Sequence, residues 1–458
     1  MVKISNRTCT SRSSRVTNDS LSPLGNKCLW TFLFIAHLTS KIWSQELSFP
    51  ISFTADEIKT VQLHPFGVPT AAPFVPLNGG ELELAFDDFA ANQRRLEMRW
   101  KHCTFDWFIS PDLDPSDCIN GFTTCTFDNI EASFNTKASY MHYRARFPND
   151  LMSFAMSGNY IVEVYDADNP AVVIVQRRFT LYENEVEIEA RVLESSLMRD
   201  KRTHQEIDFT IKHGESTYPL YDAYDALQTV LIQNGRWESA VVGIEPQFVR
   251  GSDIIFNPVG EESFSGGNSW RFVDLKSTQF AALGIQRIEE GGAFWQVYLE
   301  KDEPRTYAFH QARQDIDGHF TIANDRQENT TGSDYVQTHF SLAAYEPMAG
   351  KDIYVFGGIS DWNFNPAYRL IWNKITRQYE TVLLLKQGYY NYIYLTRDAK
   401  SLGKIDPISL AEFPGNVADI EGSHARADNV YQVLAYYWDI SGYDRVIGYQ
   451  PVRFGINP

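Results

Sequence analysis

The chain has 458 residues, of which 43% are hydrophobic, 14% aromatic and 22% charged. At roughly 100–200 residues per domain, this length predicts several domains, and the aromatic content excludes disorder for most of the chain. Lys and Arg number 41 against 58 Asp and Glu, a net charge of −17, which argues against general binding to nucleic-acid phosphates.

Residues 1–44 are predicted to be a signal peptide. An apolar run from Cys28 to Leu38 follows five basic residues and precedes small residues near Ser40 and Ser44. This length fits the apolar region of a signal peptide, about 7–15 residues, and is too short for a membrane-spanning helix of about 20. The alternative is a buried N-terminal helix. Without this segment the net charge becomes −22. Because no later segment has the pattern of a membrane span, we expect an exported protein with no direct membrane insertion.

Three cysteines follow the predicted leader, at positions 103, 118 and 125. Cys118 and Cys125 flank a six-residue segment and are candidates for a disulfide in an oxidising compartment, with free thiols as the alternative. The cysteines lack the paired spacing of a zinc site. No metal or cofactor is therefore expected.

Alternation of apolar and polar residues with a period of two, the pattern of half-buried strands, continues along most of the chain. In the first predicted domain, residues 45–184, the runs 160–165 and 171–175 flank a turn-forming segment and predict a hairpin. An acidic joint at 183–185 ends this domain. The other runs predicted as strands are 81–86, 176–182, 186–192, 206–211, 227–232, 294–299, 336–342, 353–356, 368–372, 379–385, 390–395, 430–437 and 444–449.

Two further domains are predicted, at residues 185–344 and 345–458, with the boundary at the Pro- and Gly-containing segment 345–350. No segment of ten or more residues after the leader has a helical period. Many short strands separated by Gly- and Pro-containing turns are typical of β-sandwiches. We therefore predict an all-β protein of tandem, immunoglobulin-like β-sandwich domains with no large helical domain.

The sequence contains no pattern that would indicate an enzyme. The nucleophile-elbow, HExxH, P-loop and GxGxxG motifs do not occur, and the histidines lack ligand spacing. The segment 315–318, Asp-Ile-Asp-Gly, resembles part of a calcium loop but lacks the other oxygen ligands. We interpret it as a turn in which Gly318 adopts a positive φ.

Two aromatic segments are candidates for binding a partner. Trp362 and Phe364 lie in a loop that suits either a sugar-stacking platform or a core or protein contact. Tyr389 and Tyr390 are adjacent in a predicted strand, so their side chains point to opposite faces. A single sandwich covers only one of these faces, which favours contact with another domain or a partner.

Taken in order, a dozen short motifs resemble the plug protein of the type IX secretion system over roughly residues 50–396. They are Trp100–Ser110, Asn120–Phe122, Ser133–Thr136, Tyr140–Tyr143, Phe147–Asn149, Ser157–Tyr160, Arg177–Phe179, Gln233–Trp237, Gly266–Asp274, Asp315–Phe320, Gly357–Trp362 and Leu385–Tyr392. Two positions depart from the family pattern. Cys118 replaces an aromatic residue, and Ser269-Trp270 replaces an acidic-aromatic pair.

The resemblance implies a non-enzymatic periplasmic protein, held at the outer membrane through its partner. Such a plug binds the large β-barrel translocon of the outer membrane and closes its periplasmic opening when no cargo passes. The partner surface is expected to cluster exposed aromatic residues, first among them Trp362, Phe364, Tyr389 and Tyr390. The alternative is an exported carbohydrate-binding β-sandwich protein that uses the Trp362 loop. A hydrolase ranks below both.

Overall fold

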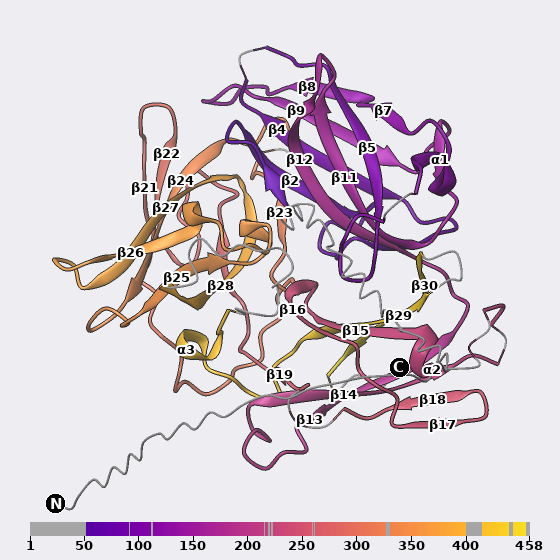
Figure 1. The fold of residues 1–458 in the computed structure, drawn as a ribbon. Helices are drawn as coiled ribbons and strands as arrows, with labels where there is room; N and C mark the ends of the chain where they lie inside the picture. Colours follow the sequence, from indigo (N-terminus) through magenta and orange to yellow (C-terminus); the bar gives the residue numbers. More distant parts are fainter. Residues whose placement is uncertain are drawn as a thin grey trace, which may run out of the picture. The chain divides into compact units, whose positions relative to one another are not determined.

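The computed structural model describes residues 52–454, except positions 91, 111–112, 215, 219, 221–222, 259, 261, 327–329, 400–414 and 439–442. The predicted signal peptide lies outside the described residues. All the helices and strands described below lie in one compact unit, Leu47–Pro458. They are drawn in Figure 1.

The first group of strands forms two facing sheets around a shared core (Figure 1). Fully buried aromatic side chains fill this core, among them Phe86, Trp100, Tyr160 and Phe179. The predicted hairpin of this region is confirmed as β11 and β12. These strands pair antiparallel, with Gly158 opposite Leu181 at one end and Asp166 opposite Asn169 at the other. One sheet has the order β1 (Phe53–Thr54), β12 (Asn169–Tyr182), β11 (Gly158–Asp166), β5 (Leu96–Cys103) and β7 (Thr124–Thr126), with β3 (Phe74–Pro76) beside β12. The other has the order β2 (Ile58–Pro65), β4 (Leu82–Asp88), β9 (Met141–Phe147) and β8 (Asn129–Ala132). A small sheet of β10 (Met152–Phe154) and β6 (Ile119–Gly121) follows the one-turn helix α1 (Pro115–Cys118).

The second group also has two sheets, and one of them is completed by the end of the chain. β15 pairs antiparallel with β29, with Leu227 opposite Tyr437 and Gln233 opposite Tyr431. Strands about 200 residues apart in the sequence are therefore neighbours. A common core joins the two sheets. The first sheet has the order β13 (Glu187–Glu194), β14 (His204–Lys212), β18 (Asp253–Phe256) and β17 (Phe248–Arg250), with β19 (Phe264–Ser265) beside β14. The second has the order β16 (Arg236–Val242), β15 (Leu227–Gln233), β29 (Val430–Trp438) and β30 (Asp444–Arg453), and α2 (Ala223–Ala226) precedes β15.

The third group is one nine-stranded sheet that surrounds a single core. Val273 in β20 and Val297 in β22, near opposite ends of the strand order, belong to the same cluster of buried residues. The sheet therefore folds over on itself. Its order is β20 (Arg271–Asp274), β28 (Gly388–Asp398), β25 (Lys351–Phe356), β26 (Arg369–Asn373), β27 (Gln378–Lys386), β24 (Tyr335–Ala343), β22 (Trp295–Leu299) and β21 (Ile285–Glu289), with β23 (Phe320–Ile322) beside β28. The short helical turns are η1 (Gly358–Ser360), η2 (Pro366–Tyr368) and α3 (Ala418–Glu421).

The fold class predicted from the sequence is confirmed. Nearly all described elements are strands, and each described α-helix has four residues. No helix among the described residues is long and apolar enough to cross a membrane. The sheets do not coincide with the predicted ranges 45–184, 185–344 and 345–458. Strands from residues 185–344 are divided between the second and third groups, and β29 and β30 from the end of the chain belong to the second group. The three-domain division stays a prediction.

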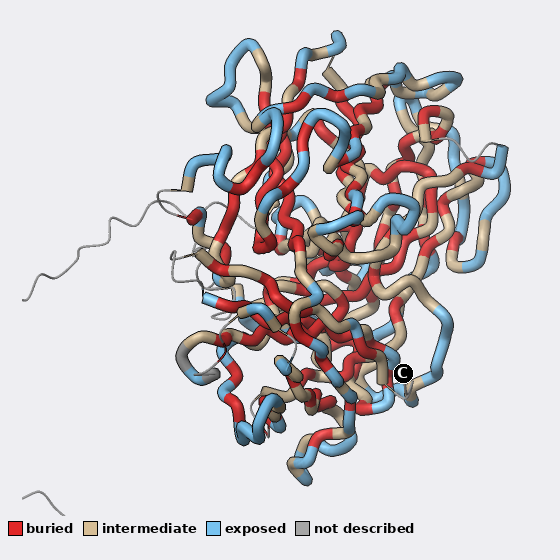
Figure 2. Tube along the Cα trace, turned by 90° about the vertical axis from the view of Figure 1, so that its right-hand side faces the viewer, coloured by how far each residue is buried: buried red, intermediate tan, exposed pale blue. Residues whose placement is uncertain are grey.

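The three groups of strands share buried side chains where they meet. Phe74 of β3 packs in one cluster with Val230, Leu434 and Val446 of the β15–β29–β30 sheet. Thr180 of β12 donates to Asn159, whose side chain also accepts from Tyr436 of β29. Figure 2 shows buried residues running through the interior of the molecule, with exposed residues in the outer loops.

Candidate interaction surface

Outside the apolar cores, one deeply buried pair of charges lies where two groups of strands meet. Asp87 of β4 accepts from Lys386 Nζ of β27 at 2.6 Å and from the Tyr335 hydroxyl of β24 at 2.6 Å. His142 Nδ1 lies 2.7 Å from the other carboxylate oxygen. The Lys386 ammonium also lies 4.3 Å from the centre of the Tyr140 ring. These contacts join the first group of strands to the third.

Both charges of this pair are removed from solvent, since Asp87 and Lys386 are 0% and 1% exposed. Burial lowers the pKa of Lys386. Burial acts against ionisation of Asp87 as well, but the Lys386 ammonium and the His142 contact hold the Asp87 pKa below its usual value. A buried pair that loses one partner leaves an uncompensated charge, so this contact strongly favours the packed arrangement of the two groups.

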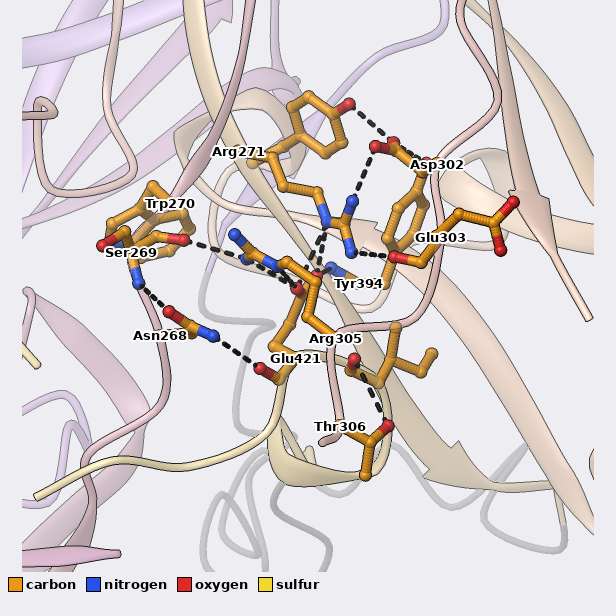
Figure 3. A network of polar contacts seen from close by, with 12 residues as sticks. Asn268, Ser269, Trp270, Arg271, Asp302, Glu303, Arg305, Thr306, Tyr394 and Glu421 are labelled. Atoms are coloured by element: carbon orange, nitrogen blue, oxygen red, sulfur yellow. Dashed lines mark hydrogen bonds and ion pairs between the residues drawn. The ribbon is translucent and has the colours of Figure 1, made fainter. Parts of the chain in front are cut away.

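A second buried network closes the nine-stranded sheet (Figure 3). Glu421 of α3 accepts from Arg271 Nε of β20 at 3.0 Å and from Arg305 Nε at 2.7 Å. Arg271 also donates to Asp302, which lies just after β22. The Tyr394 hydroxyl of β28 donates to the same carboxylate at 2.8 Å. Arg271 and Asp302 therefore connect the two end regions of the sheet.

Beside this network lies a polar cleft of about 670 Å³, bounded by β20, by residues 299–302 after β22 and by the segment 305–313. Two large apolar side chains line it while remaining exposed to solvent, Phe309 at 94% and Leu283 at 75%. The Arg313 guanidinium lies 5.4 Å from the centre of the Phe272 ring. The Tyr389 ring stacks on the same Phe272 ring, with 5.6 Å between the ring centres. We call Phe272, Leu283, Phe309, Arg313 and Tyr389 the β20 surface.

The β20 surface includes a strand edge, because β20 ends the strand order of its sheet and has no further neighbouring strand among the described residues. Leu275 N donates to Gly388 O, and the antiparallel register pairs Val273 with Tyr390. Because hydrogen-bonded pairs alternate along an antiparallel ladder, the backbone N–H and C=O groups of Phe272 and Asp274 point away from β28. Such an edge can accept an added strand from a partner.

The four residues predicted to bind a partner have different positions. Tyr389 is half-buried and belongs to the β20 surface, whereas Tyr390 is buried, stacks on Phe320 and donates to Lys386 O. Phe364 is buried against Tyr354 and Phe356. Trp362 is half-buried. Burial thus excludes Tyr390 and Phe364 from an exposed contact surface.

The Trp362 ring is packed against other rings rather than presented as a flat platform. Its edge-to-face neighbours are Trp270 at 5.8 Å, His319 at 5.3 Å and Phe356 at 6.1 Å. The predicted turn at 315–318 is present, with Gly318 at φ +82°. A Cβ atom there would lie 2.5 Å from Trp270 and 2.7 Å from Trp362, so this glycine is required by space as well as by φ.

The candidate disulfide between Cys118 and Cys125 is corrected by the structure, in which both cysteines are free and buried. Cys118 ends α1 and leads into β6, which pairs with β10. Cys125 lies in β7, which pairs with β5 in another sheet. The short connection therefore separates the two thiols into different sheets. Burial raises the pKa of Cys118 to about 11.

Sequence reasoning missed Phe309 and Leu283 of the β20 surface and both ion-pair networks. The one available signal was the presence of Tyr307 and Phe309 in a segment without strand alternation. Among the described residues, no group of three or more His, Cys, Asp or Glu side chains is placed to hold a metal ion.

These features define a class: an all-β protein of several packed sheets whose buried ion pairs tie the groups of strands together. Residues 58–183 match the family described as the first domain of the type 9 secretion system plug protein. This match supports the resemblance to the type 9 secretion system plug protein over residues 58–183. The matched range runs from the start of β2 to the residue after β12.

One solved structure is similar over almost the whole chain. It is described as the crystal structure of a hypothetical protein from Parabacteroides merdae ATCC 43184 at 2.30 Å resolution, and it is 29% identical with a TM-score of 0.82. The similarity covers 89% of this chain and 100% of the other. No curated protein matches the sequence.

Proposed function

We propose that this protein is a non-enzymatic periplasmic plug, which binds the outer-membrane translocon of the type 9 secretion system and occludes its periplasmic opening. The observation that carries the proposal is the plug-family first domain at residues 58–183. Residues 1–44 serve as the signal peptide that brings the chain to the periplasm. The protein is then held at the outer membrane by its partner.

The packing of the described residues suits this task. A plug has to keep its shape against a wide opening, and close-packed protein interiors resist deformation. The Asp87–Lys386 pair joins the first and third groups of strands, and the Thr180–Asn159–Tyr436 contacts join the first to the second. Separation of the groups would expose these buried polar side chains.

The β20 surface is the proposed contact with the translocon. Interface hot spots are enriched in aromatic side chains and Arg, and Phe272, Phe309, Tyr389 and Arg313 provide both. The open edge of β20 adds backbone groups for an extended segment of the translocon. Removal of the exposed Phe309 ring should weaken the contact without affecting the core.

Co-purification tests this proposal. A tagged protein should recover a large outer-membrane barrel from envelope extracts, and the Phe309→Ser/Leu283→Ser variant should recover much less. Ile375→Ser is the matched control, because Ile375 is 86% exposed at the turn between β26 and β27. The plug proposal fails if the wild-type protein recovers no such barrel. If Phe309→Ser/Leu283→Ser recovers as much barrel as the control Ile375→Ser, the contact with the translocon lies outside the β20 surface.

A permeability assay tests occlusion separately from binding. Deletion of the gene should make cells sensitive to antibiotics too large to cross an intact outer membrane, and expression of the wild-type protein should restore resistance. Unchanged sensitivity after deletion, in cells that still contain the translocon, would contradict occlusion.

A further inference from the structure

A second cavity, of about 130 Å³, lies where all three groups of strands meet. Its walls come from β2 and the segment 69–74, from Arg177 and Arg178 of β12, from the turn between β15 and β16, and from the segments 319–320 and 358–362. Phe74 and Trp237 provide apolar walls. This volume is close to, and slightly below, that of an engineered cavity of about 150 Å³ that binds benzene in another protein, so the size suits a molecule with a single small ring.

One side chain of the cavity wall is a buried cation with unpaired hydrogen-bond donors. Arg178 is 8% exposed, and its Nε and Nη1 atoms are buried without a hydrogen-bond partner among the described residues. Its guanidinium lies 4.4 Å from the ring centre of Trp107. Burial lowers the pKa of Arg178 to about 9, which still leaves it protonated at neutral pH. A buried cation of this kind needs an anion or several hydrogen-bond acceptors.

The neighbouring groups do not neutralise Arg178. The adjacent Arg177 already donates to Asp361 Oδ2 at 2.8 Å and to Thr54 Oγ1 at 2.9 Å, so Asp361 is engaged. Burial raises the pKa of the Cys103 thiol to about 12, which keeps this thiol neutral. Among the described residues, no carboxylate lies within ion-pair distance of Arg178.

The opposite polarity is also present in the cavity wall. Glu238 accepts from Arg236 at 2.6 Å through Oε1, while its Oε2 atom is buried without a partner among the described residues. The cavity wall thus combines aromatic side chains with an arginine and a glutamate that each have unpaired, buried polar atoms, and apolar walls with a few polar groups are a common composition of small-molecule sites.

From these observations we infer that the cavity is a binding site for a small organic carboxylate, whose carboxylate group is held by Arg178 and whose apolar part lies against Phe74 and Trp237. Arg suits this role because its planar fork can donate two parallel hydrogen bonds to a carboxylate. Since the site lies between the groups of strands, a bound ligand stabilises their packing. The inference does not depend on the plug function.

Fluorine NMR with 4-fluorobenzoate as the probe tests this site in the mature protein. The probe should bind in the millimolar range or tighter, whereas the neutral 4-fluorobenzamide should bind much more weakly. Arg178→Met removes the charge and keeps the length of the side chain, and it should weaken probe binding about ten- to a hundredfold. Arg191→Met is the matched control, because Arg191 is exposed on β13 and bonded to Asp208.

Thermal unfolding of each variant shows whether it is folded, and Arg178→Lys provides a second variant that keeps the positive charge. Arg178→Lys should retain part of the binding, since it lacks only the fork geometry. The inference is overturned if 4-fluorobenzoate does not bind the wild-type protein. It is also overturned if the probe binds Arg178→Met as tightly as wild type, or if the benzamide binds as well as the benzoate.

Discussion

Replacement of Lys386 by Met is expected to destabilise the protein by about 3–5 kcal/mol, because it leaves the buried Asp87 carboxylate without its cation. The Nζ–Oδ2 distance is 2.6 Å and both side chains are almost fully buried. The Tyr335 hydroxyl still donates to Asp87 in the variant, so the cost should lie near the lower end of this range. Urea denaturation of the mature protein measures the change in the free energy of unfolding.

Two further variants separate this effect from general damage. Asp87→Asn combined with Lys386→Met removes both charges and should recover a large part of the loss. Lys276→Met breaks an ion pair with Asp274 in which Lys276 is 41% exposed, and it should cost less than about 1 kcal/mol. The reasoning is refuted if Lys386→Met costs no more than Lys276→Met, or if the double variant is less stable than Lys386→Met alone.

Three other perturbations test other parts of the structure. Glu421→Gln removes the charge that two arginines share, and it should cost about 3–5 kcal/mol in urea denaturation; a loss below about 1 kcal/mol would contradict the role given to this network. Burial raises the pKa of Asp444 to about 6. Between this pKa and the lower pKa of the unfolded chain, the folded protein binds a proton that the unfolded chain does not. The contribution of Asp444 to the stability of the wild-type protein therefore rises as the pH falls through this range. Asp444→Asn should therefore stabilise the protein at pH 7 by about 2 kcal/mol, a gain that disappears towards pH 4, and a gain independent of pH would contradict the assignment. Gly318→Ala, whose new methyl group would meet two indole rings, should lower the melting temperature more than Gly251→Ala, which also has positive φ but open space around it; equal shifts would show that only backbone conformation matters there.

The strands were predictable from the sequence wherever one face is buried, because the period of two follows directly from burial. The hairpin formed by β11 and β12 is the clearest example, since a turn-forming segment separates two strongly alternating runs. Which strands pair with one another could not be predicted in the same way. β29 lies beside β15 because their side chains complete one core, and no local pattern reports a pairing across about 200 residues.

The candidate site was predictable only in part, for a related reason. Adjacent Tyr389 and Tyr390 do point to opposite faces, but the one that is buried depends on Phe320 from β23. Asp87 and Lys386 are distant in sequence, and each alone has the appearance of an ordinary charged residue on a strand. Their burial is set by the packing of two groups of strands.

Conductance of the purified translocon in a planar lipid bilayer tests the central claim most directly. Addition of the mature protein on the periplasmic side should close large open channels, and the Phe309→Ser/Leu283→Ser variant should close them only at higher concentration. Channels that stay open at saturating concentrations of the wild-type protein would contradict the proposal that this chain occludes the translocon.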